Sequence, residues 1–256
     1  MTFIRNVALF CAVITLIQCS GLRKNDKKNR EPIVKITTSM GDMYIELSDS
    51  APKHKANFIK LVKEGFYDSL LFHRVINGFM IQGGDPDSKN ADPNKMLGNG
   101  GPGYTIPAEF NTSLFHRKGA LAAARLGDAQ NPKKASSGSQ FYLAQGKVYT
   151  VAQLKQIERS KQSTQPGWNM DSLPGFKFTE QQIATYTTIG GIPFLDAAYT
   201  VFGQVIKGLE VIDNIAAVKV NRALGNRPVE DAMMEMEVLY LSVKEKEKLL
   251  SNEEEK

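Results

Sequence analysis

One short segment, residues 72–85, brings together residue types that could take part in catalysis. Its central Asn77-Gly78 pair stands between two apolar runs, which is typical of a β-hairpin. A two-residue loop would pair Arg74 with Ile81. A three-residue loop would set Arg74 opposite Gln82 on one face of the hairpin, since directly opposed residues share a face. Propensity alone leaves both registers open.

The second register gives Arg74 a role in catalysis. It places a permanent cation beside the amide of Gln82, with Phe79 and Met80 alongside. Rotation about an amide bond is opposed by about 18–20 kcal/mol of C–N resonance, and a twisted amide regains a lone pair on its nitrogen. A rigid guanidinium in an apolar cleft could stabilise that twisted state without a nucleophile. The alternative is that Arg74 is a surface ion-pair partner and the two apolar residues belong to the core.

The sequence offers little support for other kinds of catalytic site. Both cysteines, Cys11 and Cys19, lie within the first twenty residues, so the body of the chain has no disulfide framework, cysteine-based zinc site or cysteine nucleophile. The three histidines, His54, His73 and His116, show no metal-ligand spacing and are expected at the surface or at the edge of the core. Neither paired carboxylates nor a Ser-His arrangement supports a hydrolase or a nuclease. We therefore predict no metal and no cofactor.

Length and composition favour a globular domain that buries a sizeable core. The chain has 256 residues, 42% of them hydrophobic, and a mean hydropathy of −0.28. Its net charge of +5 is too small to indicate a nucleic-acid partner, and much of it lies in a basic run at residues 23–30. We predict a basic tether over residues 20–32, one domain over 33–243 and a charged tail over 244–256.

The elements expected to position the hairpin are mostly short strands. Apolar patterns at residues 33–38 and 43–47 predict a first hairpin, and helical spacing predicts helices over 52–65 and 209–218. Further strands are expected at residues 71–76, 80–82, 104–108, 120–124, 140–144, 200–205 and 236–243. Many short strands with only two main helices indicate a mainly β fold, a closed antiparallel β-barrel rather than a doubly wound sheet.

Residues 147–190 interrupt this pattern. Two helical stretches there each begin with a capping box, formed by Thr150 with Gln153 and by Thr179 with Gln182. A loop rich in Ser, Gln, Pro and Gly separates them and carries the single tryptophan of the chain, Trp168. We interpret this stretch as a helical insertion at the rim of the barrel.

The N-terminus is typical of an export signal. A positive charge precedes an apolar run at residues 7–17, which is too short to span a membrane as a helix. Residues 16–20 resemble a bacterial lipoprotein box, although Gln18 stands where a small residue is usual. We expect a signal over residues 1–19 and a lipid anchor on Cys19 that holds the protein in the bacterial cell envelope, facing the periplasm. The alternative is an ordinary secretory signal or a short uncleaved anchor.

Four segments, in the same order, resemble the cyclophilin-type peptidyl-prolyl cis-trans isomerases. Residues 72–85 match the signature of that family nearly residue for residue, and residues 119–125 and 138–142 resemble its next two blocks. The last block resembles residues 194–205. The resemblance implies a monomeric, closed, eight-stranded antiparallel barrel capped by two helices. It also implies an enzyme that isomerises X-Pro bonds and helps exported proteins to fold.

The resemblance also assigns roles position by position. Arg74 matches the catalytic arginine, and Gln82 matches the residue that orients it. The walls of the proline pocket match Phe79, Met80, Tyr142, Phe194 and Leu195. The groove for the substrate backbone matches Ala124, Arg125 and Gln140, and Tyr199 matches a rim histidine.

Three of these positions depart from the eukaryotic pattern. Phe194 replaces a frequent tryptophan, Tyr199 a histidine and Arg125 an asparagine, which affects peptide preference and inhibitor binding more than activity. The expected partners are proline-containing polypeptide segments, and the membrane through the anchor on Cys19. The competing hypothesis is a non-catalytic module that binds proline peptides, or a holdase chaperone. We favour catalysis, since mere binding would not need the arginine.

Overall fold

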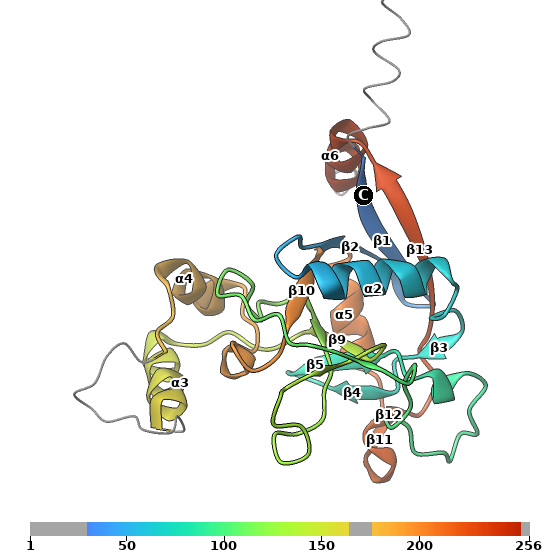
Figure 1. Ribbon diagram of the computed structural model, residues 1–256, viewed down its shortest axis with the longest axis horizontal. Coiled ribbons are helices and arrows are strands. Elements are labelled where there is room, and N and C mark those ends of the chain that lie inside the picture. The colour runs from blue at the N-terminus through green and yellow to red at the C-terminus, as the bar shows by residue number, and fades with distance from the viewer. Residues whose placement is uncertain (1–29, 164–175, 252–256) are drawn as a thin grey trace, which may run out of the picture. The chain divides into compact units, whose positions relative to one another are not determined.

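The computed structural model describes residues 30–163 and 176–251 (Figure 1). Within them the chain forms two compact units, residues 34–238 and residues 30–33 with 239–251. In the smaller unit, Arg30 donates to the carbonyl of Tyr240 over 2.8 Å and pairs with Glu245 over 3.2 Å. The expected charged tail begins there as a helix, α6 (Val243–Ser251). The expected signal, Cys19 and Trp168 lie outside the described residues.

The strands are short, as the sequence predicts. Those of the main sheet are β1 (Glu31–Thr38), β2 (Gly41–Leu47), β3 (Leu70–Leu71), β4 (Arg74–Ile76), β5 (Met80–Gly83), β7 (Ala120–Ala123), β9 (Phe141–Ala144), β10 (Val201–Lys207) and β13 (Met233–Leu241). Two minor ladders pair β6 (Thr105–Ile106) with β8 (Ser136–Ser137) and β11 (Val220–Asn221) with β12 (Arg227–Pro228). The helices are α2 (Pro52–Lys63), α3 (Val151–Ser163), α4 (Glu180–Thr188), α5 (Leu209–Ala216) and α6, with the short 3-10 turns η1 (Pro86–Ser88), η2 (Pro193–Leu195) and η3 (Arg222–Leu224).

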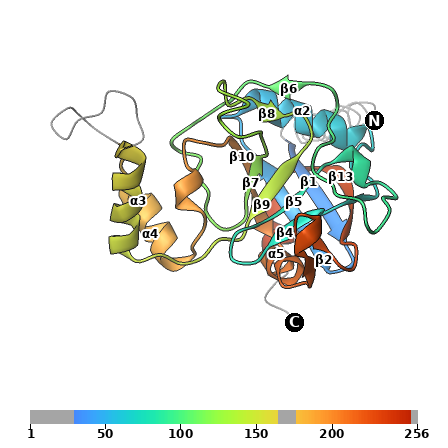
Figure 2. The ribbon, with the colours of Figure 1, turned by 90° about the horizontal axis from the view of Figure 1, so that it is seen from below.

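The main sheet is a large curled antiparallel sheet (Figure 2). Its nine strands run in the order β3-β13-β1-β2-β10-β7-β9-β5-β4. The strand expected at residues 71–76 is split into β3 and β4 by Phe72 and His73, while the one expected at 104–108 forms β6 of a minor ladder. The main sheet has nine strands instead of the eight that the resemblance implies. β3 and β4 are the two ends of this order, and the pairings of the described strands do not include the hydrogen-bonded closure that the sequence predicts.

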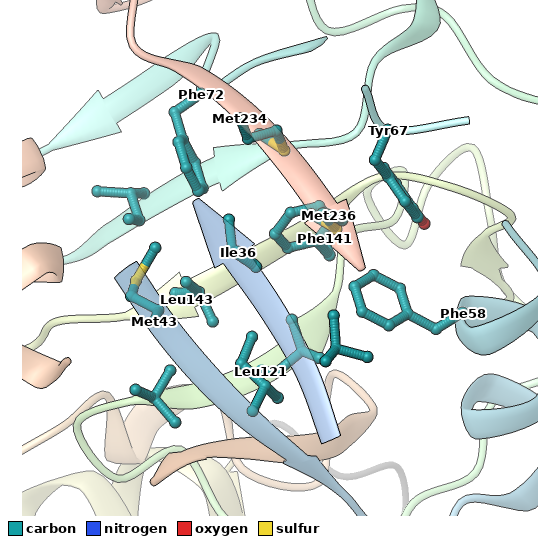
Figure 3. Close-up of a cluster of buried hydrophobic side chains, with 14 of the residues drawn as sticks. Ile36, Met43, Phe58, Tyr67, Phe72, Leu121, Phe141, Leu143, Met234 and Met236 are labelled. Carbon is teal, nitrogen blue, oxygen red and sulfur yellow. The ribbon is translucent and has the colours of Figure 1, made fainter. Parts of the chain in front are cut away.

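Side-chain alternation along the strands divides the apolar residues between the two faces of the sheet. Phe141 and Leu143 of β9 join a large core cluster with Phe58 of α2 and residues of α5 (Figure 3). There the ring of Phe141 lies 5.5 Å from that of Phe58 and 5.7 Å from that of Tyr67, in edge-on geometry that suits aromatic pairs. Burying each such side chain contributes roughly 1.5–3 kcal/mol. This core holds the strands whose opposite face carries the candidate site.

The opposite face carries a second, smaller cluster. It takes Tyr142 and Ala144 from β9, Met80 from β5, and Ala120 and Ala122 from β7. Ala120 and Ala122 pack into this smaller cluster, whereas Leu121 and Ala123 of the same strand pack into the main core. The sequence pattern of alternating residues therefore sets which side chains can line a cavity on this face.

The insertion is helical, as expected. Helices α3 and α4 lie beside one another, away from the main sheet, in both views (Figures 1 and 2). Both predicted capping boxes are present: Thr150 and Gln153 exchange hydrogen bonds, as do Thr179 and Gln182. A third apolar cluster underlies the two helices and is formed by Phe115, Tyr149, Leu154, Phe178 and Tyr186. The insertion therefore has a small core of its own.

Candidate active site

The β4–β5 hairpin has the register in which Arg74 lies directly opposite Gln82. The turn is the three-residue loop, with Ile76 paired to Met80 and Gly78 at a positive φ of 74° that suits glycine. The prediction that left two registers open and favoured this one is confirmed. Arg74 and Gln82 consequently project from the same face of the hairpin.

A single row of opposed residues crosses this face of the sheet. Gln82 lies opposite Tyr142 of β9, Tyr142 opposite Ala122 of β7, and Ala122 opposite Val201 of β10. Together with Arg74 this row spans five strands. Because opposed residues in antiparallel strands lie about 4.5–5.5 Å apart, the row sets arginine, amide and aromatic ring next to one another.

Hydrogen bonds fix the orientation of the arginine. Its Nη1 donates to Oε1 of Gln82 over 3.1 Å, and Nε2 of Gln82 donates to Oε1 of Gln140 over 3.0 Å. Gln140 in turn donates through Nε2 to the carbonyls of Gly98 and Gly100, over 2.9 and 2.8 Å. This series of amides leaves Gln82 with its oxygen toward the guanidinium. Arg74 is held by a neutral acceptor, so its charge is not neutralised there.

The arginine opens into a cavity of about 320 Å³ whose walls carry both polar and apolar side chains. Nine of the residues expected at the site line it: Arg74, Phe79, Met80, Gln82, Ala124, Arg125, Tyr142, Leu195 and Tyr199. Partial burial lowers the pKa of Arg74 from its ordinary value. That value is so far above neutrality that the guanidinium stays protonated, as a fixed hydrogen-bond donor.

Two expected site residues do not line the cavity. Gln140 lies behind Gln82 and contacts the site only through it and through the glycine loop. Phe194 is 47% exposed and stacks on Phe79 with the ring centroids 5.8 Å apart. Phe194 thus supports the outer side of a wall residue, since η2 carries it toward solvent while Leu195 faces the cavity.

Arg125 is a wall residue whose donors are engaged with the protein. Its side chain is 4% exposed, its Nε donates to the carbonyl of Ala198, and its Nη1 contacts the carbonyl of Leu126 and the carboxylate of Asp128. The guanidinium carbon also lies 4.3 Å from the centre of the Tyr199 ring. Arg125 and Tyr199, two of the departures from the family pattern, therefore form one stacked pair beside the cavity.

Part of the cavity was missed in the sequence. Residues 96–99 line it together with His73 and Gly225. The loop is held by Asp85, which accepts from the amide of Gly98, and by buried Arg227, which donates to the carbonyls of Asp92 and Lys95. Loop residues carry no periodic pattern, so no signal in the sequence marks residues 96–99. Asp85 and Arg227 act from segments more than a hundred residues apart.

The expectation that the histidines lie at the surface or at the edge of the core is wrong. All three are buried. His54 contacts Glu109 over 2.7 Å and Ser136 over 2.8 Å, and His116 contacts Asp196 and Tyr142, so four of the six ring nitrogens are satisfied internally. The sequence could not show these partners, because each lies far away in the chain.

His73 is different, because neither of its ring nitrogens has a hydrogen-bond partner among the described residues. Burial lowers the pKa of His73 to about 4, and the nearby carboxylate of Asp85 offsets only part of that effect. The imidazole is therefore neutral at neutral pH. It places an uncharged polar ring beside Arg74.

Metal-binding groups and membrane-spanning helices are not found in the described part of the chain. No group of three or more His, Cys, Asp or Glu side chains is placed to hold a metal ion there. Within the same residues, no helix is long and apolar enough to cross a bilayer. The arrangement offers a fixed cation, a polar amide row and apolar walls.

The sequence matches a known family model over the whole of the larger unit. Residues 33–238 match the model of the cyclophilin type peptidyl-prolyl cis-trans isomerase/CLD family. A protein of Staphylococcus haemolyticus that carries the name of a peptidyl-prolyl cis-trans isomerase is 36% identical over 211 residues, which cover 81% of this chain and 91% of that protein.

Of two further relatives, one is longer than this chain and the other has a lower sequence identity to it. A Streptococcus pyogenes protein, named as a bifunctional phosphatase/peptidyl-prolyl cis-trans isomerase, is 37% identical over 207 residues. The match covers 80% of this chain but spans only 38% of that protein. The crystal structure of a Cryptosporidium parvum cyclophilin type isomerase superposes with a TM-score of 0.54 and 24% identity, covering 83% of this chain and 98% of that one. The last likeness concerns the fold.

Proposed function

This chain belongs to the cyclophilin-type peptidyl-prolyl cis-trans isomerase family, and we propose that it isomerises X-Pro bonds by means of Arg74. The observation that carries the proposal is the hydrogen bond from Arg74 to Gln82 beside a cavity that Phe79, Met80 and Leu195 help to line. A related structure from Cryptosporidium parvum was determined in the presence of the dipeptide Ala-Pro. A cavity of about 320 Å³ has room for a proline ring and its neighbours.

The mechanism follows from what limits the uncatalysed reaction. X-Pro isomers exchange over tens to hundreds of seconds because the amide must lose its resonance. As the bond twists, the proline nitrogen becomes pyramidal and gains a lone pair that can accept a hydrogen bond. Arg74 would donate to that lone pair, and Gln82 would keep the guanidinium in place. The donor stabilises the twisted form more than either planar form, which is the requirement for catalysis.

The walls supply the other part of the mechanism. The rings and chains of Phe79, Met80, Tyr142 and Leu195 would hold the proline ring, while the residue before it rotates. Exclusion of bulk water from the guanidinium of Arg74 would strengthen its hydrogen bond to the proline nitrogen. No bond other than hydrogen bonds is made or broken, so the reaction needs no covalent intermediate.

We further propose that the substrates are exported polypeptides and that Cys19 carries a lipid anchor. This rests on the apolar run at residues 7–17 and the lipoprotein-like residues 16–20. Two or more acyl chains would be required for stable attachment to a membrane. The role as an enzyme and the role of the anchor are independent of each other.

The direct test is cis-to-trans isomerisation of a short Ala-Pro peptide in the presence of the purified chain. Catalysis should remove the slow phase of tens to hundreds of seconds in proportion to the protein concentration. A chain that binds the peptide but leaves the slow phase unchanged would be a binding module or holdase instead.

A further inference from the structure

We propose that Tyr186, Asp196 and His116 are positioning residues, through which the helical insertion fixes the proline-pocket wall at Tyr142. The inference deepens the proposed function, since it concerns the pocket of that same site. Tyr186 belongs to α4 and Tyr142 to β9, so the four residues connect the insertion to the main sheet. None of the three positioning residues lines the cavity itself.

The four side chains form an unbroken series of hydrogen bonds. The hydroxyl of Tyr186 donates to Oδ2 of Asp196 over 2.6 Å. Oδ1 of Asp196 lies 2.8 Å from Nδ1 of His116 and also accepts from the backbone amide of His116 over 2.8 Å. Nε2 of His116 lies 2.9 Å from the hydroxyl of Tyr142. All four residues are buried, and His116 and Tyr186 are fully so.

The chemistry of the carboxylate sets the direction of these bonds. An ionised Asp196 can only accept, so Nδ1 of His116 carries a proton and donates to it. In a neutral ring Nε2 is then an acceptor, and the hydroxyl of Tyr142 donates to it. Burial raises the pKa of Tyr142 and of Tyr186, so both keep the protons that they donate. Each group therefore has one role, and the Tyr142 hydroxyl has one position.

Asp196 connects the insertion to the cavity rim as well as to Tyr142. It directly follows η2, whose last residue, Leu195, lines the cavity. Lys161 of α3 donates to the backbone carbonyl of Asp196, while Tyr186 of α4 donates to its carboxylate. Helices α3 and α4 thus both contact Asp196, which lies between η2 and the loop that carries Tyr199. A buried charge is tolerated only when it is paired and hydrogen-bonded, which makes the position of Asp196 dependent on these donors.

The series has a particular consequence for the reaction. The ring of Tyr142 stacks on His116 at 6.0 Å and meets Tyr199 edge-on at 6.0 Å. A wall that holds the proline ring contributes to binding in the planar and the twisted forms alike. Its loss should therefore raise KM and leave kcat nearly unchanged, in contrast to loss of the arginine.

The test compares Tyr186→Phe with Tyr149→Phe. Both tyrosines belong to the apolar cluster under the insertion, but the hydrogen bonds of the described residues include none from the Tyr149 hydroxyl. Tyr186→Phe should weaken binding of an Ala-Pro peptide about threefold to tenfold, with kcat within about twofold of wild type. Tyr149→Phe should bind the peptide as wild type does. Equal affinity in wild type and Tyr186→Phe, at the same folded fraction, would overturn the proposal.

A double variant shows whether the effect travels through Tyr142. Tyr142→Phe removes the far end of the series and keeps the wall ring. Tyr186→Phe added to Tyr142→Phe should cost far less affinity than it does alone, since coupled residues are not additive. Fully additive losses would mean that Tyr186 acts by another route, and would also overturn the proposal.

Nitrogen NMR of the unaltered protein provides a test that needs no variant. The chain has three histidines, which makes the ring signals of His116 assignable. A ring that carries a proton on Nδ1 is expected, and a ring protonated only at Nε2 would overturn the series. Neither this measurement nor peptide affinity requires turnover. If the wild type proved inactive while these results held, the proposed isomerase function would fail and the positioning role would stand for a peptide-binding pocket.

Discussion

Arg74 and Gln82 face each other across one hairpin, with 3.1 Å between the donating Nη1 and the accepting Oε1. An acidic partner in place of Gln82 would form an ion pair and compete with a substrate for the guanidinium. A neutral amide orients the arginine and leaves its charge available. The relationship therefore distinguishes a catalytic arginine from an ordinary structural ion pair.

Substitution of Arg74 should separate catalysis from binding. Loss of one preorganised donor typically costs about 10²–10³ in rate, and we expect Arg74→Ala near the lower end, with much less change in peptide affinity. Arg74→Lys should restore only part of the rate, because an ammonium is a flexible point charge without a planar fork. Isomerisation rates, peptide affinity and thermal melting of the three proteins decide the matter. Equal rates in wild type and Arg74→Ala would remove Arg74 from the mechanism.

Burial of His73 should make the protein less stable in mild acid. Its folded pKa is about 4, below the ordinary value near 6.5, so the unfolded chain binds a proton first as the pH falls. Above about pH 6.5, His73 has almost no effect on the free energy of unfolding. Between about pH 6.5 and 4 it lowers that free energy progressively, by at most roughly 3 kcal/mol. Urea unfolding over this range should show a steeper decline for wild type than for His73→Gln. Parallel curves would mean that the imidazole is not held neutral by the fold.

Inhibitor binding should depend on residue 194. In the family, a tryptophan at this position donates its indole N–H to cyclosporin, and phenylalanine has no such donor. One lost hydrogen bond costs about 0.5–1.5 kcal/mol, so we expect normal proline turnover with weakened cyclosporin inhibition. Phe194 is 47% exposed, which leaves room for the larger indole in Phe194→Trp. Inhibition constants of cyclosporin for the native protein and for Phe194→Trp test this. Binding of cyclosporin as tight in the native protein as in the variant would contradict the prediction.

The anchor can be tested on the native chain. If Cys19 is acylated, the mature protein starts there, has a mass increased by its acyl chains and partitions into detergent. Cys19→Ala should release the protein or leave the precursor uncleaved, whereas Cys11→Ala, the matched control, should change nothing. Intact mass of the purified protein gives the answer. An unmodified chain beginning at another residue would rule out the lipoprotein form.

Local patterns predicted much of the fold. The Asn77-Gly78 turn, the two capping boxes and the short strands of the sheet each depend on residues close together in the sequence. The division of 71–76 into two strands was missed, because Phe72 and His73 follow the same apolar pattern as a continuous strand.

The site was predictable only where it follows the family pattern. The position of Phe194 was predicted as a pocket wall, and it lies outside the cavity because η2 turns Leu195 inward instead. The partners of Arg125 and His116 come from distant segments, and their pairing depends on tertiary packing that no spacing in the sequence encodes. The burial of the three histidines was missed for the same reason.

The cavity has no local origin in the chain. Its lining begins at His73 and ends at Gly225, and includes side chains from β4, β5 and β9 as well as from loops such as the one that follows β7. Such long sequence separations delay assembly until distant segments have met. If the chain is exported N-terminus first, as we propose, it would have no proline pocket until nearly nine-tenths of the residues had emerged. The enzyme would gain activity in one late step, after its own folding and too late to act on its own prolines.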